Sequence, residues 1–259
     1  MRLIRSLLFR SLHLGSQISF VTRKWREYLF QASMYGFCQL LSLTHPVRDR
    51  EISCFVVSLN GSDRMKWIGD LADTIPSLQI WEAVDGYDPL ATMAAFGQSG
   101  LSFHGWLEEW RGKKFNRYGV LACFLPKYYL LVHQARMQYP FVIFLEDDIF
   151  VDKCFWRFAK NACLLFKIFP SLNMVRLGPL GEGYITSMDG AQRIASLIRE
   201  TGMIEHSDMQ LRNHCGPEIS LARLNPISGL VDANCGDTNQ TALFSQKDME
   251  LLLGAKRSF

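Results

Sequence analysis

Three consecutive carboxylates, Glu146, Asp147 and Asp148, are the residues of this chain whose types and spacing are best suited to chemistry. Side chains alternate along an extended strand, so Glu146 and Asp148 face one way and Asp147 the other. Like charges this close repel one another unless a positive group neutralises them. A Mn²⁺ or Mg²⁺ ion prefers carboxylate oxygens and can in turn hold a diphosphate. The triplet therefore predicts a metal and diphosphate site, and a solvated acidic turn is the alternative that it leaves open.

These carboxylates end an apolar run at residues 141–145, which predicts a buried central strand because it is short, β-branched and aromatic. Ligands of open α/β sheets bind beyond the carboxyl ends of such strands. Residues 52–59 form a second apolar strand, residues 64–75 carry apolar side chains at helical spacing, and residues 78–81 return as a strand. Strand, helix and strand in this order predict a right-handed βαβ unit in an α/β, Rossmann-like domain with a mostly parallel central sheet.

Later segments continue this alternation, and the expected elements are a helix within residues 118–139, a helix at 153–168, a strand at 173–178 and a helix at 188–200. Pro126 is expected to mark the first turn of a helix, where its missing N–H is tolerated. Ser187 and Gly202 suit the two ends of the last helix. Residues 87–117, which contain several glycines and two tryptophans, predict an insertion or lid.

Charge is distributed unevenly over the 259 residues. Residues 1–50 contain eight lysines and arginines against two acidic residues, a net charge of +6, whereas residues 51–259 contain 20 against 23, a net charge of −3. The body is therefore not expected to bind nucleic acid. We predict a basic N-terminal arm and linker, residues 1–50, followed by a single domain, residues 51–259. Residues 1–43 are expected to be dispensable for folding.

The arm is open to more than one interpretation. Its apolar stretches are too short and too charged for a transmembrane span, but they suit an organelle-targeting segment or a helix in peripheral contact with a membrane surface. Alternatively, the arm packs on the body as an amphipathic helix through Trp25, Tyr28, Leu29, Phe30, Met34 and Phe37.

Cysteine usage bears on the compartment in which the chain works. The seven cysteines are odd in number and lack C-x-x-C spacing, which favours reduced, buried thiols and a cytoplasmic location. The glycosylation acceptor pattern at residues 60–62 points the same way, because a glycan on Asn60 would obstruct the predicted nucleotide site.

Seven short segments, taken in order, resemble glycosyltransferase family 25, which includes bacterial lipooligosaccharide galactosyltransferases and collagen hydroxylysine galactosyltransferases. They are residues 55–64, 83–86, 119–123, 144–148 (Phe-Leu-Glu-Asp-Asp), 177–178, 184–187 and 190–191. The resemblance extends over roughly residues 52–210 and rests on the ordered set. It implies a GT-A-type nucleotide-sugar-binding domain, a UDP-sugar donor and inverting transfer.

The resemblance also implies roles for individual residues. Asp148 and Glu146 would hold Mn²⁺ (or Mg²⁺), which would neutralise charge on the departing nucleoside diphosphate. The implied donor-binding residues are Leu59, Asn60, Arg64, Asp85, Lys127, Glu146 and Asp147. Inverting transfer needs a base that takes the proton of the acceptor hydroxyl. Asp208 matches the position of that base, and Glu182, in a glycine-rich loop, is the second candidate.

Structural interpretations stand beside these roles. Asp85 suits an Asp-Gly turn, Arg64 suits the exposed start of a helix, and Asp208 and Glu182 suit a solvated surface. One departure from the family is clear, because Lys127 follows Pro126 where the family usually has a Ser-His pair. The change puts donor choice and activity in doubt, and it also makes Lys127 available as a point charge for phosphate.

Three functions are compatible with the sequence. The first is a metal-assisted glycosyltransferase that moves a hexose, galactose before others, from a UDP-sugar to a hydroxyl of a glycan or a hydroxylated side chain. The second is a non-catalytic relative that binds glycan or nucleotide-sugar. The third is a nucleotidyltransferase, which the single glycine and single basic residue in residues 60–64 disfavour. The acidic triplet favours the first function and the missing Ser-His pair favours the second.

Overall fold

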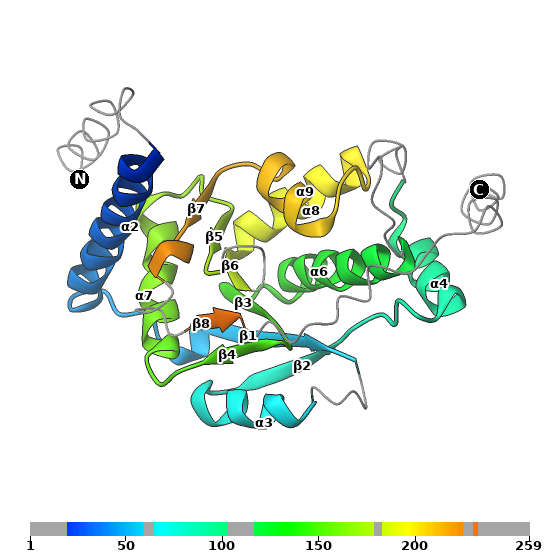
Figure 1. The fold of residues 1–259 in the computed structure, drawn as a ribbon, viewed down its shortest axis with the longest axis horizontal. Helices are drawn as coiled ribbons and strands as arrows, with labels where there is room; N and C mark the ends of the chain where they lie inside the picture. The colour runs from blue at the N-terminus through cyan, green and yellow to red at the C-terminus, as the bar shows by residue number, and fades with distance from the viewer. Residues whose placement is uncertain (1–19, 60–64, 103–116, 179–182, 225–229, 233–259) are drawn as a thin grey trace.

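The structure, a computed structural model, describes residues 20–59, 65–102, 117–178, 183–224 and 230–232. A six-stranded sheet with the order β2-β1-β3-β6-β5-β7 lies at its centre (Figure 1). The strands are β1 (Ile52–Ser58), β2 (Leu78–Glu82), β3 (Phe141–Glu146), β5 (Met174–Arg176), β6 (Gly183–Ser187) and β7 (Glu218–Ser220). Of these six, β6 runs against the others, since it pairs antiparallel with both β3 and β5. The prediction of an α/β fold with a mostly parallel sheet is confirmed.

The helices form two layers, one on each face of the sheet. They are α2 (Phe20–Ser42), α3 (Met65–Thr74), α4 (Pro89–Ser99), α6 (Arg117–Met137), α7 (Phe155–Ile168), α8 (Met188–Thr201) and α9 (Ser207–His214). Side chains alternate along each strand, so Cys54 and Val56 of β1 join the core beneath α3 and α7, whereas Phe55 joins the core beneath α6 and α8. Two hydrophobic cores therefore hold the sheet between the layers.

The predicted βαβ unit is confirmed in β1, α3 and β2, because β1 and β2 are parallel neighbours. On its other side β1 pairs with β3, and Val57 lies opposite Glu146, so the carboxyl ends of these strands lie together. After Glu146 the chain turns at residues 147–148 and enters β4 (Ile149–Val151), which pairs with β8 (Leu230–Asp232) in a separate two-stranded sheet. The acidic triplet thus occupies the point where the chain leaves the central sheet.

Helix α6 differs from the prediction, because Pro126 lies in its interior and not in a first turn. An interior proline costs about 3 kcal/mol, since it removes one hydrogen bond and crowds the preceding turn. The flanking side chains of Phe124, Leu125 and Tyr128 are each at most 3% exposed. Burying each of them contributes about 1.5–3 kcal/mol, so tertiary packing outweighs the helix-breaking residue.

Helix α2 packs along α7 and shares its core with the rest of the chain (Figure 1). Met34, Tyr35 and Cys38 are almost completely buried, and the Tyr35 ring stacks on Phe158 of α7 with the centroids 4.3 Å apart. In residues 20–42 the arm is therefore part of the core, in contrast to the dispensable basic arm that the charge distribution predicted. Charge gave no sign of this, because the side chains of α2 that join the core are uncharged.

The segment predicted as an insertion or lid contains α4, and residues 103–116 lie outside the described part of the chain. Asp88 caps α4, since its carboxylate accepts hydrogen bonds from the backbone N–H groups of Leu90 and Ala91. The predicted cap of α8 is confirmed as well, because the Ser187 hydroxyl accepts a hydrogen bond from the backbone N–H of Gly190.

Two glycines, Gly86 and Gly190, permit close approaches between elements. A Cβ atom on Gly86 would lie 2.6 Å from the Cα of Gly119 at the start of α6, and one on Gly190 would clash with the carbonyl oxygen of Asn173. No larger residue fits either position without a backbone shift. Among the described helices, none combines the length and apolar character that crossing a membrane requires.

Candidate active site

A partly buried cluster of three charged side chains lies at the carboxyl end of β3. The Nζ atom of Lys127, from the middle of α6, is 2.8 Å from Oε1 of Glu146 and 2.6 Å from Oδ1 of Asp208. Asp208 lies in the first turn of α9, and the hydroxyl oxygen of its neighbour Ser207 is 3.3 Å from the same Nζ atom. An ammonium group has three N–H donors, so all three are directed at partners within the protein.

The cluster joins segments that are distant in the sequence, yet it is open to a ligand. Lys127 is only 3% exposed, whereas the side chains of Glu146 and Asp208 are 31% and 24% exposed. The ammonium also lies 5.3 Å from the centroid of the Phe144 ring, which favours the positive charge. The lysine is therefore the inner member of the cluster, and the two carboxylates are its accessible face.

Burial and charge act in opposite directions on the members of this cluster. Burial lowers the pKa of Lys127, but the negative charges of Asp208 and Glu146 outweigh it and raise that pKa well above its usual value. Burial raises the pKa of Glu146 to about 7, a rise that Asp208 and Asp148 reinforce and Lys127 opposes. Burial also works to raise the pKa of Asp208, but the Lys127 charge overcomes it and lowers that pKa overall. Asp208 is therefore the ionised partner of the lysine near neutral pH.

The three residues of the acidic triplet have different surroundings. Glu146 turns towards Lys127, whereas Asp147 is 8% exposed and its Oδ2 accepts a hydrogen bond of 2.7 Å from the hydroxyl of Ser58. That bond fastens the end of β1 to the turn after β3, which is a structural task. Asp148 lies near enough to Glu146 to raise its pKa. The opposite orientations of Glu146 and Asp147 agree with the alternation expected along a strand.

Asp85, predicted to contact the donor, takes part in a turn. Its Oδ1 accepts a hydrogen bond of 2.8 Å from the backbone N–H of Tyr87, and its carbonyl oxygen accepts one from the hydroxyl of Thr92. It is exposed and follows β2, two strands from β3. Leu59 is half-buried at the end of β1. The predicted residues Asn60, Arg64 and Glu182 lie outside the described part of the chain.

The expected metal site fits these residues only in part. Among the described residues, no group of three or more histidine, cysteine, aspartate or glutamate side chains lies close enough together to hold a metal ion. Glu146 does not fit as a ligand, because the Lys127 ammonium lies 2.8 Å from its Oε1 and would repel a divalent cation there. This argument does not apply to Asp148, the other residue predicted to bind the metal.

The sequence did not predict the ion pairs of Lys127 or the aromatic pair, Phe144 and Tyr184, that lies near it. The Phe144 ring stacks on Tyr184 with the centroids 4.6 Å apart, and the Tyr184 hydroxyl, which is buried, has no hydrogen-bond partner among the described residues. One signal was present, because Lys127 interrupts a run of apolar residues in α6. A lysine in such a run is buried only if it is paired.

An aromatic pocket of about 400 Å³ lies at the carboxyl end of β2, and Pro126, the residue before Lys127 in α6, is part of its lining. Its lining residues are Trp81, Glu82, Val84, Pro126, Tyr129, Val132, His133 and Arg136. The Trp81 and His133 rings are 5.0 Å apart, and burial, with help from the Arg136 charge, lowers the pKa of His133. The neutral imidazole and the indole therefore offer flat, apolar surfaces at the carboxyl end of β2.

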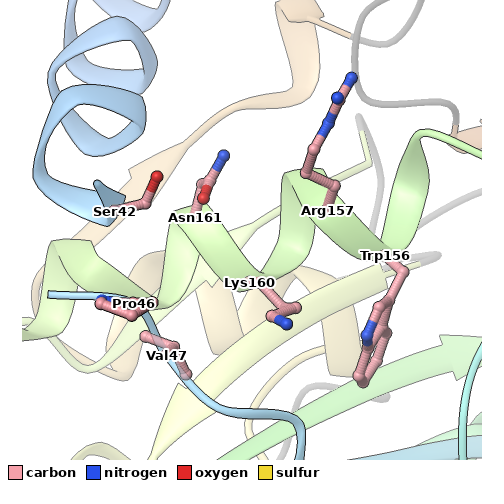
Figure 2. A pocket seen from close by; sticks show the side chains of 7 residues that line it. All are labelled: Ser42, Pro46, Val47, Trp156, Arg157, Lys160 and Asn161. Atoms are coloured by element: carbon pink, nitrogen blue, oxygen red, sulfur yellow. The ribbon is translucent and has the colours of Figure 1, made fainter. Parts of the chain in front are cut away.

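A second pocket, of about 270 Å³, lies between the end of α2 and α7 (Figure 2). Figure 2 shows Asn161, Lys160, Arg157 and Trp156 of α7 around it. The Lys160 ammonium is 2.6 Å from Asp49, and the Trp156 indole N–H donates to the same carboxylate. This pocket has no acidic residue in its lining and belongs to the opposite helical layer, so it is separate from the Lys127 cluster.

Comparison with known proteins gives little beyond this geometry. No protein-family model matches the sequence, and no curated protein matches it. Among solved structures, the chain is similar to a glycosyltransferase involved in the glycosylation of the major capsid of PBCV-1. The sequence identity is 8%, the match covers 78% of this chain and 98% of that one, and the TM-score is 0.39. A similarity at this level establishes neither a shared activity nor shared ligands.

Proposed function

We propose that this chain is a glycosyltransferase of the GT-A type that transfers a hexose, with inversion, from a UDP-sugar to a hydroxyl of a glycan or a hydroxylated side chain. UDP-galactose is the first donor to test, because the sequence resembles family 25. The observation that carries the proposal is the pair of accessible carboxylates, Glu146 and Asp208, at the carboxyl end of the central strand β3. Nucleotides bind at this edge of α/β sheets, beside a βαβ unit such as β1, α3 and β2.

Asp208 is the general base of the proposed reaction. The Lys127 charge keeps its carboxylate ionised, and a side chain that is 24% exposed can be reached by an acceptor. Asp208 takes the proton of the acceptor hydroxyl while the hydroxyl oxygen bonds to the anomeric carbon. The bond from that carbon to the diphosphate breaks, and its electron pair leaves with the nucleoside diphosphate. Glu182 is the alternative base.

Glu146 has a binding role in this proposal. Its outward oxygen accepts hydrogen bonds from hydroxyls of the donor's sugar or ribose, while its Oε1 stays on Lys127. The ammonium of Lys127 already has three partners, so contact between Lys127 and phosphate would require it to give one of them up.

In this proposal, Asp148 would bind a Mn²⁺ or Mg²⁺ ion. Such an ion would supply positive charge for the departing diphosphate when it is bound. Asp148→Ala should abolish the manganese-dependent part of donor binding while the protein stays folded. Calorimetry that finds the same donor affinity with and without manganese in both proteins would remove the metal from the proposal.

One observation favours a second function, that of a non-catalytic relative that binds nucleotide-sugar or glycan. A single ammonium is paired with both Glu146 and Asp208, as in a site built to bind and not to move protons. Donor hydrolysis separates the two functions. We expect UDP release from at least one of several UDP-sugars and its loss in Asp208→Asn. The control is Glu200→Gln, which removes an exposed carboxylate of α8. Donor binding without turnover for every sugar would establish the second function.

We also propose a cytoplasmic location with peripheral contact at an anionic membrane surface. One observation in support is an exposed apolar stripe on α2, where Trp25, Leu29 and Leu40 are 63%, 58% and 66% exposed. The other is charge, because residues 1–26 contain no acidic residue. Sedimentation with phosphatidylserine vesicles should retain the protein, and Trp25→Ser with Leu29→Ser should release it. Equal retention on neutral phosphatidylcholine vesicles, or none on either, would contradict the proposal.

A further inference from the structure

Lys127 holds together two carboxylates that the fold brings from separate segments. Glu146 ends β3, Asp208 begins α9, and one nitrogen atom lies within 2.8 Å of an oxygen of each. The Ser207 hydroxyl completes the set at 3.3 Å, so the ammonium has three oxygen neighbours. The side chain reaches this point from α6 and is 3% exposed.

Three oxygen neighbours around a buried positive charge resemble the surroundings of a bound metal ion. A small divalent cation would bond two such carboxylates at about 2.0–2.2 Å, and it would occupy the region that the Nζ atom now fills. Both cations do the same electrostatic work, because each offsets the repulsion between two negative groups. They exclude each other, since a divalent ion beside the ammonium would be repelled by it.

We propose that Lys127 takes the place of a divalent cation between Glu146 and Asp208, so that the protein's own charge positions both carboxylates and this pair binds no metal. Lys127 is thus a positioning residue. The proposal deepens the function proposed above by separating two parts of the site, a metal-free carboxylate pair and Asp148. The test does not depend on that function, because metal binding is measured without donor or acceptor.

The test is Mn²⁺ binding to the full chain, followed by electron paramagnetic resonance of the free ion. We expect Glu146→Gln and Asp208→Asn to leave the Mn²⁺ affinity within about twofold of the wild-type value, whether the wild type binds weakly or not at all. Lys127→Met keeps the length of the side chain and removes its charge. It should create a site at least about tenfold tighter than any in the wild type, and adding Glu146→Gln should abolish it.

Two outcomes would overturn the proposal. The first is a tenfold loss of Mn²⁺ affinity in Glu146→Gln alone, which would show that Glu146 is already a metal ligand. The second is a folded Lys127→Met protein with no gain in affinity. If Lys127→Met is insoluble, the two single carboxylate variants decide the matter, because both retain the lysine. A merely structural lysine would not produce a new manganese site when it is removed.

Discussion

Replacing Lys127 by methionine should destabilise the protein through the two carboxylates that it leaves behind. In the native protein these carboxylates share one ammonium, at 2.8 Å from Glu146 and 2.6 Å from Asp208. Methionine fills much of the same volume, so the loss is one of charge and hydrogen bonds and creates little cavity. Without the ammonium, Glu146 and Asp208 face each other with less hydration than in the unfolded chain.

The structure sets the size of the expected effect. Removing one partner of a buried ion pair costs about 3–5 kcal/mol of the free energy of unfolding. Because Glu146 and Asp208 are 31% and 24% exposed, water screens part of their repulsion, and we expect a loss of about 3 kcal/mol, at the lower limit of that range. The ion pair of Lys160 and Asp49 supplies the control. It is as short, at 2.6 Å, but more exposed, so Lys160→Met should cost less than about 1 kcal/mol.

Urea denaturation of the full chain, followed by tryptophan fluorescence near neutral pH, measures both values. A second variant, Asp208→Asn in the Lys127→Met background, should recover part of the loss because it removes a carboxylate charge that the ammonium no longer offsets. Equal losses below about 1 kcal/mol for Lys127→Met and Lys160→Met would refute the reasoning, since the cluster would then contribute no more than a surface pair.

Three further predictions concern stability. Because the pKa of Glu146 is about 7 in the folded protein and 4.5 in the unfolded chain, the folded state holds a proton there at pH values at which the unfolded state has lost it. The free energy of unfolding should therefore fall as pH rises from 4.5 to about 7. Glu146→Gln should flatten this slope in urea titrations at a series of pH values. Gly86→Ala should cost about 1–3 kcal/mol in the same assay, because its Cβ would meet the backbone of Gly119, and an unchanged midpoint would argue against that close approach. Deletion of residues 1–43 should lower the thermal midpoint of unfolding by many degrees or give insoluble protein, because burial of Met34 alone contributes about 1.5–3 kcal/mol. A soluble product with the same midpoint as the full-length protein would contradict this.

The elements that sequence predicted well are those with a strong local pattern. The apolar runs before Glu146 and in β1 became neighbouring parallel strands, because a continuous apolar run fits a sheet covered on both faces. The cap at Ser187 was predicted from local chemistry and is present. Pro126 misled the prediction because its local preference was overruled by the burial of its neighbours.

The candidate site was predicted less completely, for a physical reason. Glu146 and Asp208 were both identified, but their connection through Lys127 depends on α6 and α9 packing side by side, which no local pattern encodes. Charge composition likewise indicated a loose arm, while the burial of Tyr35 against α7 depends on a contact with Phe158 more than a hundred residues away. Long-range contacts of this kind follow from the fold as a whole.

The position of β2 at one end of the sheet has a consequence for handling the protein. Among the described strands β2 pairs with β1 alone, and Ile80 in its middle is 50% exposed. An open strand edge with an apolar face can recruit the same strand of another molecule and begin a continuous intermolecular sheet. Pro76 before the strand and Glu82 at its end limit such growth to a short stretch. Self-association in concentrated samples would therefore start at β2, and a lysine in place of Ile80 would suppress it without disturbing either core.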